Sequence, residues 1–238
     1  MSQNRKVLIS MYSYIYPGET HSVSVIRDSY LIKLAQYNLV PILISGNTSQ
    51  NTLEELYSIC SGVLFPGGMD IDPDFYGEVR HIKTQKSDKN RDQMELTILQ
   101  KTLKDNKPFL GICRGAQALA IACGGSLMQH LPDITKEEHD ISEGQSYDHL
   151  YTNPMHEVII SRDSKAYGIF NNEKITVPSG HHQAIKNPGS LRVSGVSPEG
   201  IIEIVEHPSL PFHIGFQGHP EVTTSLDALF QAFSQAIG

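Results

Sequence analysis

Cysteine is scarce in this sequence, which contains only three, an odd number without regular spacing. Small disulfide-rich proteins instead carry an even number of cysteines in a dense framework. The scarcity therefore excludes a disulfide-based scaffold and fits a reducing compartment. We expect the protein to be cytoplasmic.

Long apolar runs are also missing. No stretch approaches the roughly 20 apolar residues that a membrane-spanning helix needs. The first residues, Met-Ser-Gln-Asn-Arg-Lys, lack the apolar core of a signal peptide. We therefore expect a globular protein without a membrane partner.

Positive charge is in deficit, with 19 Lys and Arg against 26 Asp and Glu and a net charge of -7. This balance argues against nucleic acid or an anionic membrane surface as a partner. A polar stretch at 128–151 contains His130, His139 and His149, but no His-x-x-x-His or Cys-x-x-Cys spacing occurs. We therefore predict that the protein has no metal site.

What the first half does contain is an alternation of short apolar segments with amphipathic ones. Strands are predicted at 6–11, 39–44, 62–65 and 108–112, and helices at 25–37, 52–60, from 91 onward and at 114–122. This order predicts an α/β fold with a doubly wound, mostly parallel sheet of the flavodoxin-like type. Ligands of such sheets bind at the carboxyl ends of the strands.

The second half is richer in short β-type runs, at 158–161, 175–178, 191–195, 201–206 and 212–217. Turn signals separate these runs, and a last helix is predicted at about 225–236. We expect an antiparallel extension with one strand returning to the main sheet. No repeat, low-complexity tract or linker is visible, so we expect a single domain over residues 1–238.

Cys113 lies between the predicted strand 108–112 and the predicted helix 114–122. Gly111 and Gly115 flank it in the Gly-x-nucleophile-x-Gly spacing of a nucleophile elbow. A side chain at that joint stands at the positive end of the helix dipole, which favours a thiolate. The alternative is a buried structural cysteine at a tight turn.

A cysteine nucleophile needs a base that also protonates the leaving group, and histidine is the usual choice. His219 follows the strand predicted at 212–217, and Glu221 two residues later is placed to orient its imidazole. Gly67 and Gly68 follow another predicted strand, where their N–H groups can stabilise an oxyanion. Each motif alone also fits an ordinary surface turn.

Three stretches resemble the class I glutamine amidotransferase superfamily, in particular its peptidase C26 branch of γ-glutamyl-γ-aminobutyrate hydrolase-like proteins. They are Gly-Ile-Cys-Arg-Gly at 111–115, Pro-Gly-Gly-Met-Asp-Ile-Asp-Pro-Asp-Phe-Tyr-Gly-Glu at 66–78 and Gly-Phe-Gln-Gly-His-Pro-Glu at 215–221. The resemblance covers about 40–222. It implies a class I glutamine amidotransferase-like fold, a Cys113–His219–Glu221 triad, an oxyanion hole and no cofactor. The implied oxyanion hole is formed near Gly67, Gly68 and Arg114.

The segment Gly-His-His-Gln at 180–183 is similar to a His-His-Gln stretch that this branch places near its substrate. The resemblance thereby implies a group of substrate-binding residues: Gln117, His181, His182 and Gln183. It also includes an Arg-Asp-x-x-Glu segment at 91–95. One departure is Gly218, where the family usually has an aromatic residue, and we expect this change to open the pocket.

The resemblance implies a cysteine-dependent hydrolase that cleaves a γ-glutamyl amide, such as γ-glutamyl-γ-aminobutyrate, through a glutamyl thioester. One alternative is a glutaminase subunit that supplies ammonia to a separate synthetase. Another is a non-catalytic binding module on the same fold. The expected partner is a small γ-glutamyl molecule. The oligomeric state stays open, with a homodimer as one option.

Overall fold

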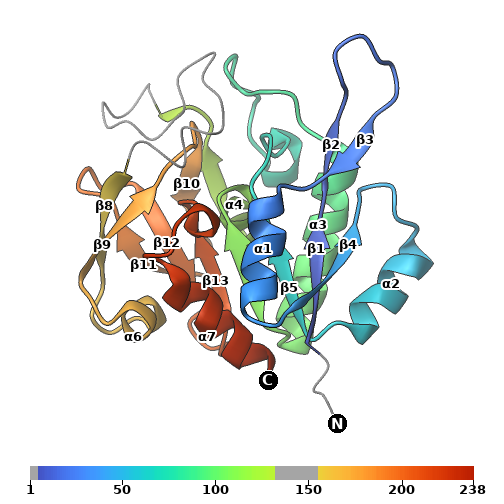
Figure 1. The fold of residues 1–238 in the computed structure, drawn as a ribbon. Coiled ribbons are helices and arrows are strands. Elements are labelled where there is room, and N and C mark those ends of the chain that lie inside the picture. The colour runs from blue at the N-terminus through green and yellow to red at the C-terminus, as the bar shows by residue number, and fades with distance from the viewer. Residues whose placement is uncertain (1–4, 132–154) are drawn as a thin grey trace.

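The computed structural model describes residues 5–131 and 155–238, and one large β-sheet runs through its centre (Figure 1). Its main path follows the order β4 (Val40–Ile44), β1 (Lys6–Ser10), β5 (Gly62–Phe65), β6 (Phe109–Ile112), β13 (His213–Phe216), β12 (Ile202–Glu206), β11 (Arg192–Val196), β8 (Met155–Ile160) and β9 (Lys174–Pro178). Pairs from β4 to β13 are parallel, and pairs from β13 to β9 are antiparallel. The predicted parallel sheet, its antiparallel extension and the returning strand are thus confirmed.

Four short strands were not expected from the sequence. β7 (Ser126–Met128) and β10 (Ala184–Asn187) pair with each other, and β10 also pairs with β12. β2 (Tyr12–Tyr14) and β3 (Val23–Val25) form a separate hairpin. Segments of three or four residues show too little periodicity to predict, because their pairing comes from partners far along the chain.

Helices cover both faces of the parallel part of the sheet: α1 (Asp28–Gln36), α2 (Gln50–Ile59), α3 (Lys89–Asp105), α4 (Arg114–Ala122) and α7 (Asp227–Ile237), with α6 (Lys165–Phe170) beside the extension. The helix predicted from 25 begins at 28, since residues 23–25 pair in the hairpin. α3 begins at Lys89, because the Asp88 carboxylate caps it by accepting the Arg91 N–H at 3.1 Å. α6 was not predicted.

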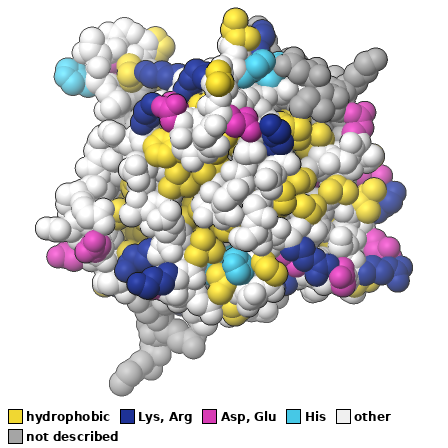
Figure 2. Space-filling view, turned by 180° about the vertical axis from the view of Figure 1, so that it is seen from behind, with side chains coloured by type: hydrophobic (Ala, Val, Ile, Leu, Met, Phe, Trp, Pro, Cys, Tyr) yellow, Lys and Arg dark blue, Asp and Glu magenta, His cyan; other side chains and the backbone are white. Residues whose placement is uncertain are grey.

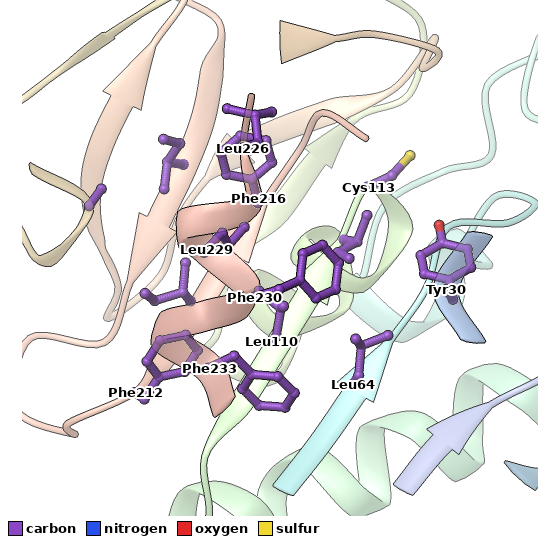
Figure 3. Packing of buried hydrophobic residues seen from close by; sticks show 14 of the residues in the cluster. Tyr30, Leu64, Leu110, Cys113, Phe212, Phe216, Leu226, Leu229, Phe230 and Phe233 are labelled. Atoms are coloured by element: carbon purple, nitrogen blue, oxygen red, sulfur yellow. The ribbon is translucent and has the colours of Figure 1, made fainter. Parts of the chain in front are cut away.

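Two hydrophobic cores lie on the two faces of the sheet. Leu64 and Leu110 pack with residues of α1 and α7, whereas the neighbouring Val63 and Phe109 pack with residues of α2, α3 and α4. This alternation is the period of two expected for strands buried on both faces. Figure 3 shows the first core, in which Phe230 of α7 lies among buried side chains below Cys113. Each fully buried side chain of this size contributes about 1.5–3 kcal/mol.

Seen from behind, the surface carries positive and negative side chains near one another, with apolar groups between them (Figure 2). No helix within the described residues is long and apolar enough to cross a membrane. The carboxyl ends of β5, β6 and β13 lie together in the parallel part of the sheet, and each is followed by one of the segments singled out above.

Candidate active site

Cys113 lies at the junction of β6 and α4, with φ 52° and ψ -108°. Few residues other than glycine adopt a positive φ, because Cβ meets the backbone. A Cβ on Gly111 would lie 2.4 Å from the Gly115 carbonyl oxygen, and one on Gly115 would lie 2.1 Å from the Phe65 carbonyl oxygen. The strand–turn–helix predicted from the glycine spacing is therefore confirmed, and both glycines are needed for the close approach.

His219 follows β13 and precedes the short 3₁₀ helix η3 (Pro220–Val222). Its Nδ1 lies 2.8 Å from Glu221 Oε1, and both side chains are buried. Burial, the strongest single influence, lowers the pKa of His219. The charges of Glu221 and Cys113, with hydrogen bonds to both, outweigh it and raise this pKa to about 10. The imidazole is therefore held in its charged form at neutral pH, beside the cysteine.

The loop after β5 contains the two glycines expected to supply oxyanion donors. The Gly67 N–H donates to Tyr30 Oη at 3.0 Å, so this amide already has an acceptor. Gly68 lines the cavity that contains Cys113, as does Gly67. Arg114 is the first residue of α4, and its N–H has no acceptor within the helix. Of the three amides implied by the resemblance, those of Gly68 and Arg114 therefore stay candidates for an oxyanion hole.

A buried arginine, Arg91, holds the glycine loop after β5 by hydrogen bonds to its carbonyl oxygens. Arg91 Nη2 donates to the carbonyl oxygens of Pro66 and Gly67 at 3.1 and 3.2 Å. Its Nε donates to Glu95 Oε1 at 2.7 Å, and both side chains are almost fully buried. A Cβ on Gly68 would lie 2.2 Å from Arg91 Nη1, so no larger residue fits there without a shift.

The same network reaches the elbow. The Arg114 guanidinium pairs with both Asp92 and Glu95, and Asp92 Oδ2 also accepts the Asp72 N–H at 3.0 Å. Burial by itself raises the pKa of Glu95, but the charges of Arg114 and Arg91 hold it below its usual value. The Arg-Asp-x-x-Glu segment therefore ties the glycine loop to α4. In isolation, an acidic first helical turn looks like a dipole complement, which is why sequence reasoning gave it little weight.

Two cavities meet at Cys113. The larger, of about 250 Å³, is lined by Cys113, His219, Gly68 and Arg27, among others. The smaller, of about 100 Å³, brings the four residues implied to contact the substrate together with Cys113: Gln117, His181, His182 and Gln183. Cys113 thus lies where the two cavities meet, and they share Gly68 and Gly180 as well.

The smaller cavity is organised by Asp70, which was not among the predicted site residues. Asp70 is 6% exposed. Its Oδ1 lies 2.9 Å from His182 Nε2, and its Oδ2 accepts from Gln183 Nε2 at 3.0 Å. Gln117 Nε2 donates to the Gln183 carbonyl oxygen at 3.1 Å. Asp72 is also buried, at 4% exposed, but it pairs with Arg80, so the alternation of acids at 70, 72 and 74 does not show which of them reaches this cavity.

His181 and Gln217 complete the surroundings. His181 Nδ1 lies 2.9 Å from the Gln183 carbonyl oxygen, and its Nε2 lies 3.7 Å from Glu203 Oε1. Gln217 Nε2 lies 3.7 Å from Cys113 Sγ. Gln217 was not singled out beforehand, although it follows β13 two residues before His219.

Gly218 does not open the pocket, so that expectation was wrong. A Cβ at Gly218 would lie 3.0 Å from the Pro178 carbonyl oxygen and 3.1 Å from Val177 Cβ, against β9. The next residue's amide, the His219 N–H, donates to the same Pro178 oxygen at 2.9 Å. The missing side chain therefore lets the loop approach β9 closely.

The prediction that the protein has no metal site stays a prediction. Among residues 5–131 and 155–238, no group of three or more His, Cys, Asp or Glu side chains could hold a metal ion. His130 is described, with Nδ1 3.4 Å from His182 Nδ1. His139 and His149 lie outside the described residues.

Residues 9–221 match the model of one protein family, Peptidase C26. The chain belongs to the peptidase C26 family. This membership, together with the relatives below, supports a hydrolase. The resemblance noted in the sequence is thus confirmed.

Two relatives illustrate the range of names within this peptidase C26 group. One is a Mycobacterium tuberculosis protein, Rv2859c, whose name gives glutamine amidotransferase as an unproven activity. It is 37% identical to this chain over 175 residues, and the match covers 73% of this chain and 54% of that protein. The chain thus spans about half the length of that relative. The γ-glutamyl-γ-aminobutyrate hydrolase PuuD of Escherichia coli is 29% identical over 218 residues, 88% of this chain and 83% of that one.

A solved structure shares the fold. A glutamine amidotransferase of Thermotoga maritima superimposes with a TM-score of 0.59 at 18% identity, covering 98% of this chain and 84% of that one. At such low identity the likeness shows the class I glutamine amidotransferase fold alone.

Proposed function

We propose that this peptidase C26 member is a cysteine-dependent hydrolase of γ-glutamyl amides. The observation that carries the proposal is that Cys113 and His219 line one cavity, while Glu221 Oε1 lies 2.8 Å from His219 Nδ1 and its charge helps to keep the imidazole charged. Such an arrangement generates a thiolate and supplies the proton that an amine leaving group needs. Because a thiolate nucleophile must stay reduced, we infer a cytoplasmic location.

In the proposed reaction Cys113 Sγ attacks the side-chain carbonyl carbon of the glutamyl group. The oxyanion that forms accepts from the N–H groups of Gly68 and Arg114. The His219 imidazolium then protonates the departing nitrogen, which leaves a glutamyl thioester. Neutral His219 next takes a proton from water, whose oxygen displaces the thiolate and releases glutamate. No cofactor takes part in these steps.

The two cavities divide the substrate. The smaller one presents Asp70, His182 and Gln183 and suits the polar glutamyl head. The larger one would receive the amine, and it borders a groove of about 740 Å³ through the shared residue Met69.

Charge along this second path is mainly positive. Arg27 lines the cavity, and Lys86 lines the groove. Lys89 also lines the groove, so its lining contains two lysines and one carboxylate, that of Asp88. We therefore propose that the leaving amine carries a carboxylate, as γ-aminobutyrate does, a choice also supported by the name of the Escherichia coli relative.

The test is a hydrolysis panel of γ-glutamyl conjugates of γ-aminobutyrate, n-butylamine and putrescine, together with glutamine. We expect kcat/KM to be highest for the anionic amine, lower for the neutral one and lowest for the cationic one. Arg27→Gln should reduce the ratio of kcat/KM between the γ-aminobutyrate and n-butylamine conjugates by about tenfold, which corresponds to roughly 1.4 kcal/mol. Arg162→Gln, at an exposed arginine paired with Glu173, is the matched control.

Two results would contradict the proposal. Absence of hydrolysis for every conjugate would remove the hydrolase, and equal rates for all three amines would remove the preference for a carboxylate. Ammonia release from glutamine only in the presence of a synthetase would instead favour the glutaminase subunit.

A further inference from the structure

Tyr30 has a polar hydroxyl at the site, but it has no role in the proposed triad mechanism. It lies on α1 and is 2% exposed, with its ring in the same hydrophobic core as Cys113. Tyr30 nevertheless lines the cavity with Cys113 and His219, and its hydroxyl oxygen lies 3.0 Å from the Gly67 nitrogen. In Figure 3 the Tyr30 hydroxyl and the Cys113 sulfur both point out of the core in the same direction. Tyr30 therefore packs its ring in the core of the protein and places its hydroxyl at the edge of that core, on the side of Cys113.

Distances around Gly67 place this hydroxyl close to the reacting groups. A Cβ on Gly67 would lie 3.2 Å from His219 Cε1, 3.3 Å from Tyr30 Oη and 3.6 Å from Cys113 Cβ. The phenol, the imidazole and the cysteine thus surround one backbone position. Because glycine has no Cβ at that position, the side chains of Tyr30, His219 and Cys113 can all lie close to the glycine loop.

Two side chains hold the peptide units of this loop. Tyr30 Oη accepts the Gly67 N–H at 3.0 Å, and Arg91 Nη2 donates to the carbonyl oxygens of Pro66 and Gly67. The Pro66–Gly67 peptide is therefore held at its N–H and at its C=O. In a trans peptide the N–H and C=O point in opposite directions. Because Arg91 holds the Gly67 carbonyl on one side, the Gly68 N–H points away from Arg91.

We propose that Tyr30 is a positioning residue of the oxyanion hole. By accepting the Gly67 N–H it fixes the rotation of the glycine loop, so that Gly68 alone of the two amides is presented to the carbonyl oxygen of the substrate. The inference rests on the proposed γ-glutamyl chemistry. It adds a residue of α1, outside the three stretches that carry the family resemblance.

The test compares Tyr30→Phe with Tyr57→Phe. Both tyrosines are buried and hydrogen-bonded, and Tyr57 Oη donates to Asp105 at 3.1 Å. Each change removes one oxygen and keeps the ring. Tyr57 therefore controls for the general cost of losing a buried hydroxyl.

Two thiol probes separate positioning from folding. The γ-glutamyl diazoketone 6-diazo-5-oxo-L-norleucine presents a ketone where the amide carbonyl would lie. The thiolate adds to the ketone carbon, whose oxygen becomes an oxyanion, and the sulfur then displaces N₂ from the adjacent protonated carbon as the ketone re-forms. Methyl methanethiosulfonate labels thiols without a carbonyl. We expect Tyr30→Phe to slow diazoketone labelling of Cys113 by about tenfold or more, since losing one oxyanion donor costs about 100-fold or more in comparable enzymes. Labelling by the thiosulfonate should be unchanged.

Steady-state kinetics add an independent readout. With the best amide of the panel, Tyr30→Phe should lower kcat and leave KM within about twofold, because only the transition state carries the oxyanion. Tyr57→Phe should leave kcat, KM and both labelling rates unchanged, even where it lowers the melting temperature.

Other outcomes would overturn the inference. If Tyr30→Phe slows both probes equally or neither, Tyr30 serves the fold and not the oxyanion hole. If the wild-type protein reacts with the thiosulfonate but ignores the diazoketone, the proposed γ-glutamyl chemistry fails, and the role of Tyr30 fails with it.

Discussion

His219 Nδ1 lies 2.8 Å from Glu221 Oε1, a buried contact between residues on either side of Pro220. The geometry leaves Nε2 as the nitrogen that works on the substrate side. A carboxylate in this place orients the ring and stabilises its charged form. The following predictions begin from this pair.

Removing each member of the triad should have graded effects. By analogy with serine triads, Cys113→Ala and His219→Asn should lower kcat by about a million-fold, and Glu221→Gln by one to two orders of magnitude less. Cys113→Ala combined with Glu221→Gln should be no worse than Cys113→Ala, because the residues act as a unit. Kinetics on the best γ-glutamyl amide, with circular dichroism to confirm folding, measure this. Near-normal hydrolysis by folded Cys113→Ala would refute the nucleophile.

The pH dependence should follow the pKa of His219. This pKa is raised to about 10, so the imidazolium needed to protonate the amine persists through neutral pH, and kcat/KM should fall as pH rises through about 10. Glu221 is the leading charge that raises this pKa. In Glu221→Gln the alkaline limb should therefore move toward neutral pH. A pH–rate profile of both proteins decides this, and an unmoved limb would contradict the assignment.

Cys113 should be the only cysteine that iodoacetamide alkylates rapidly at neutral pH. Burial raises the pKa of Cys60 to about 11 despite the nearby lysines, and burial also raises the pKa of Cys123. Both therefore stay thiols, whereas Cys113 faces the charged His219. Mass spectrometry after brief treatment shows the order of labelling. Earlier modification of Cys60 or Cys123 would count against the site.

Glu95→Gln should destabilise the protein by about 3–5 kcal/mol, because it removes the negative charge that is paired with two buried guanidinium groups. Arg91 and Arg114 both pair with Glu95 inside the protein. Glu54→Gln removes an exposed charge on α2 and is the control, with an expected change in stability below about 0.5 kcal/mol. Urea unfolding followed by circular dichroism gives both values. Equal stability of the two variants would mean that the network contributes little.

Gly218→Ala should cost about 1–3 kcal/mol, because its Cβ meets the Pro178 carbonyl oxygen and Val177. Activity should fall by the same factor on every conjugate, since the residue faces β9 and not the cavity. Gly168→Ala on α6, where nothing lies within 4 Å of the added carbon, is the matched control. Selective loss on bulky amines would show that Gly218 does border the substrate.

Much of the fold follows from local pattern. Strand β5 at 62–65 and helix α4 at 114–122 agree with their predicted bounds, because apolar period and glycine punctuation act within a few residues. Cys113, His219 and Glu221 were also identifiable from the sequence, because short motifs place each at a strand end. The short strands β7 and β10 could not be predicted, because distant partners create them.

The sequence by itself determined the elbow, the triad candidates and the parallel core, since each depends on neighbours along the chain. Only the tertiary structure decided which charges and hydroxyls lie at the site. Asp70 turns inward although it lies in an acidic loop, and Arg91 and Glu95 are buried although they begin a polar helix. Tyr30 brings its hydroxyl to Gly67 across 37 residues. Burial and long-range hydrogen bonding assign these roles, and neither leaves a trace in local periodicity.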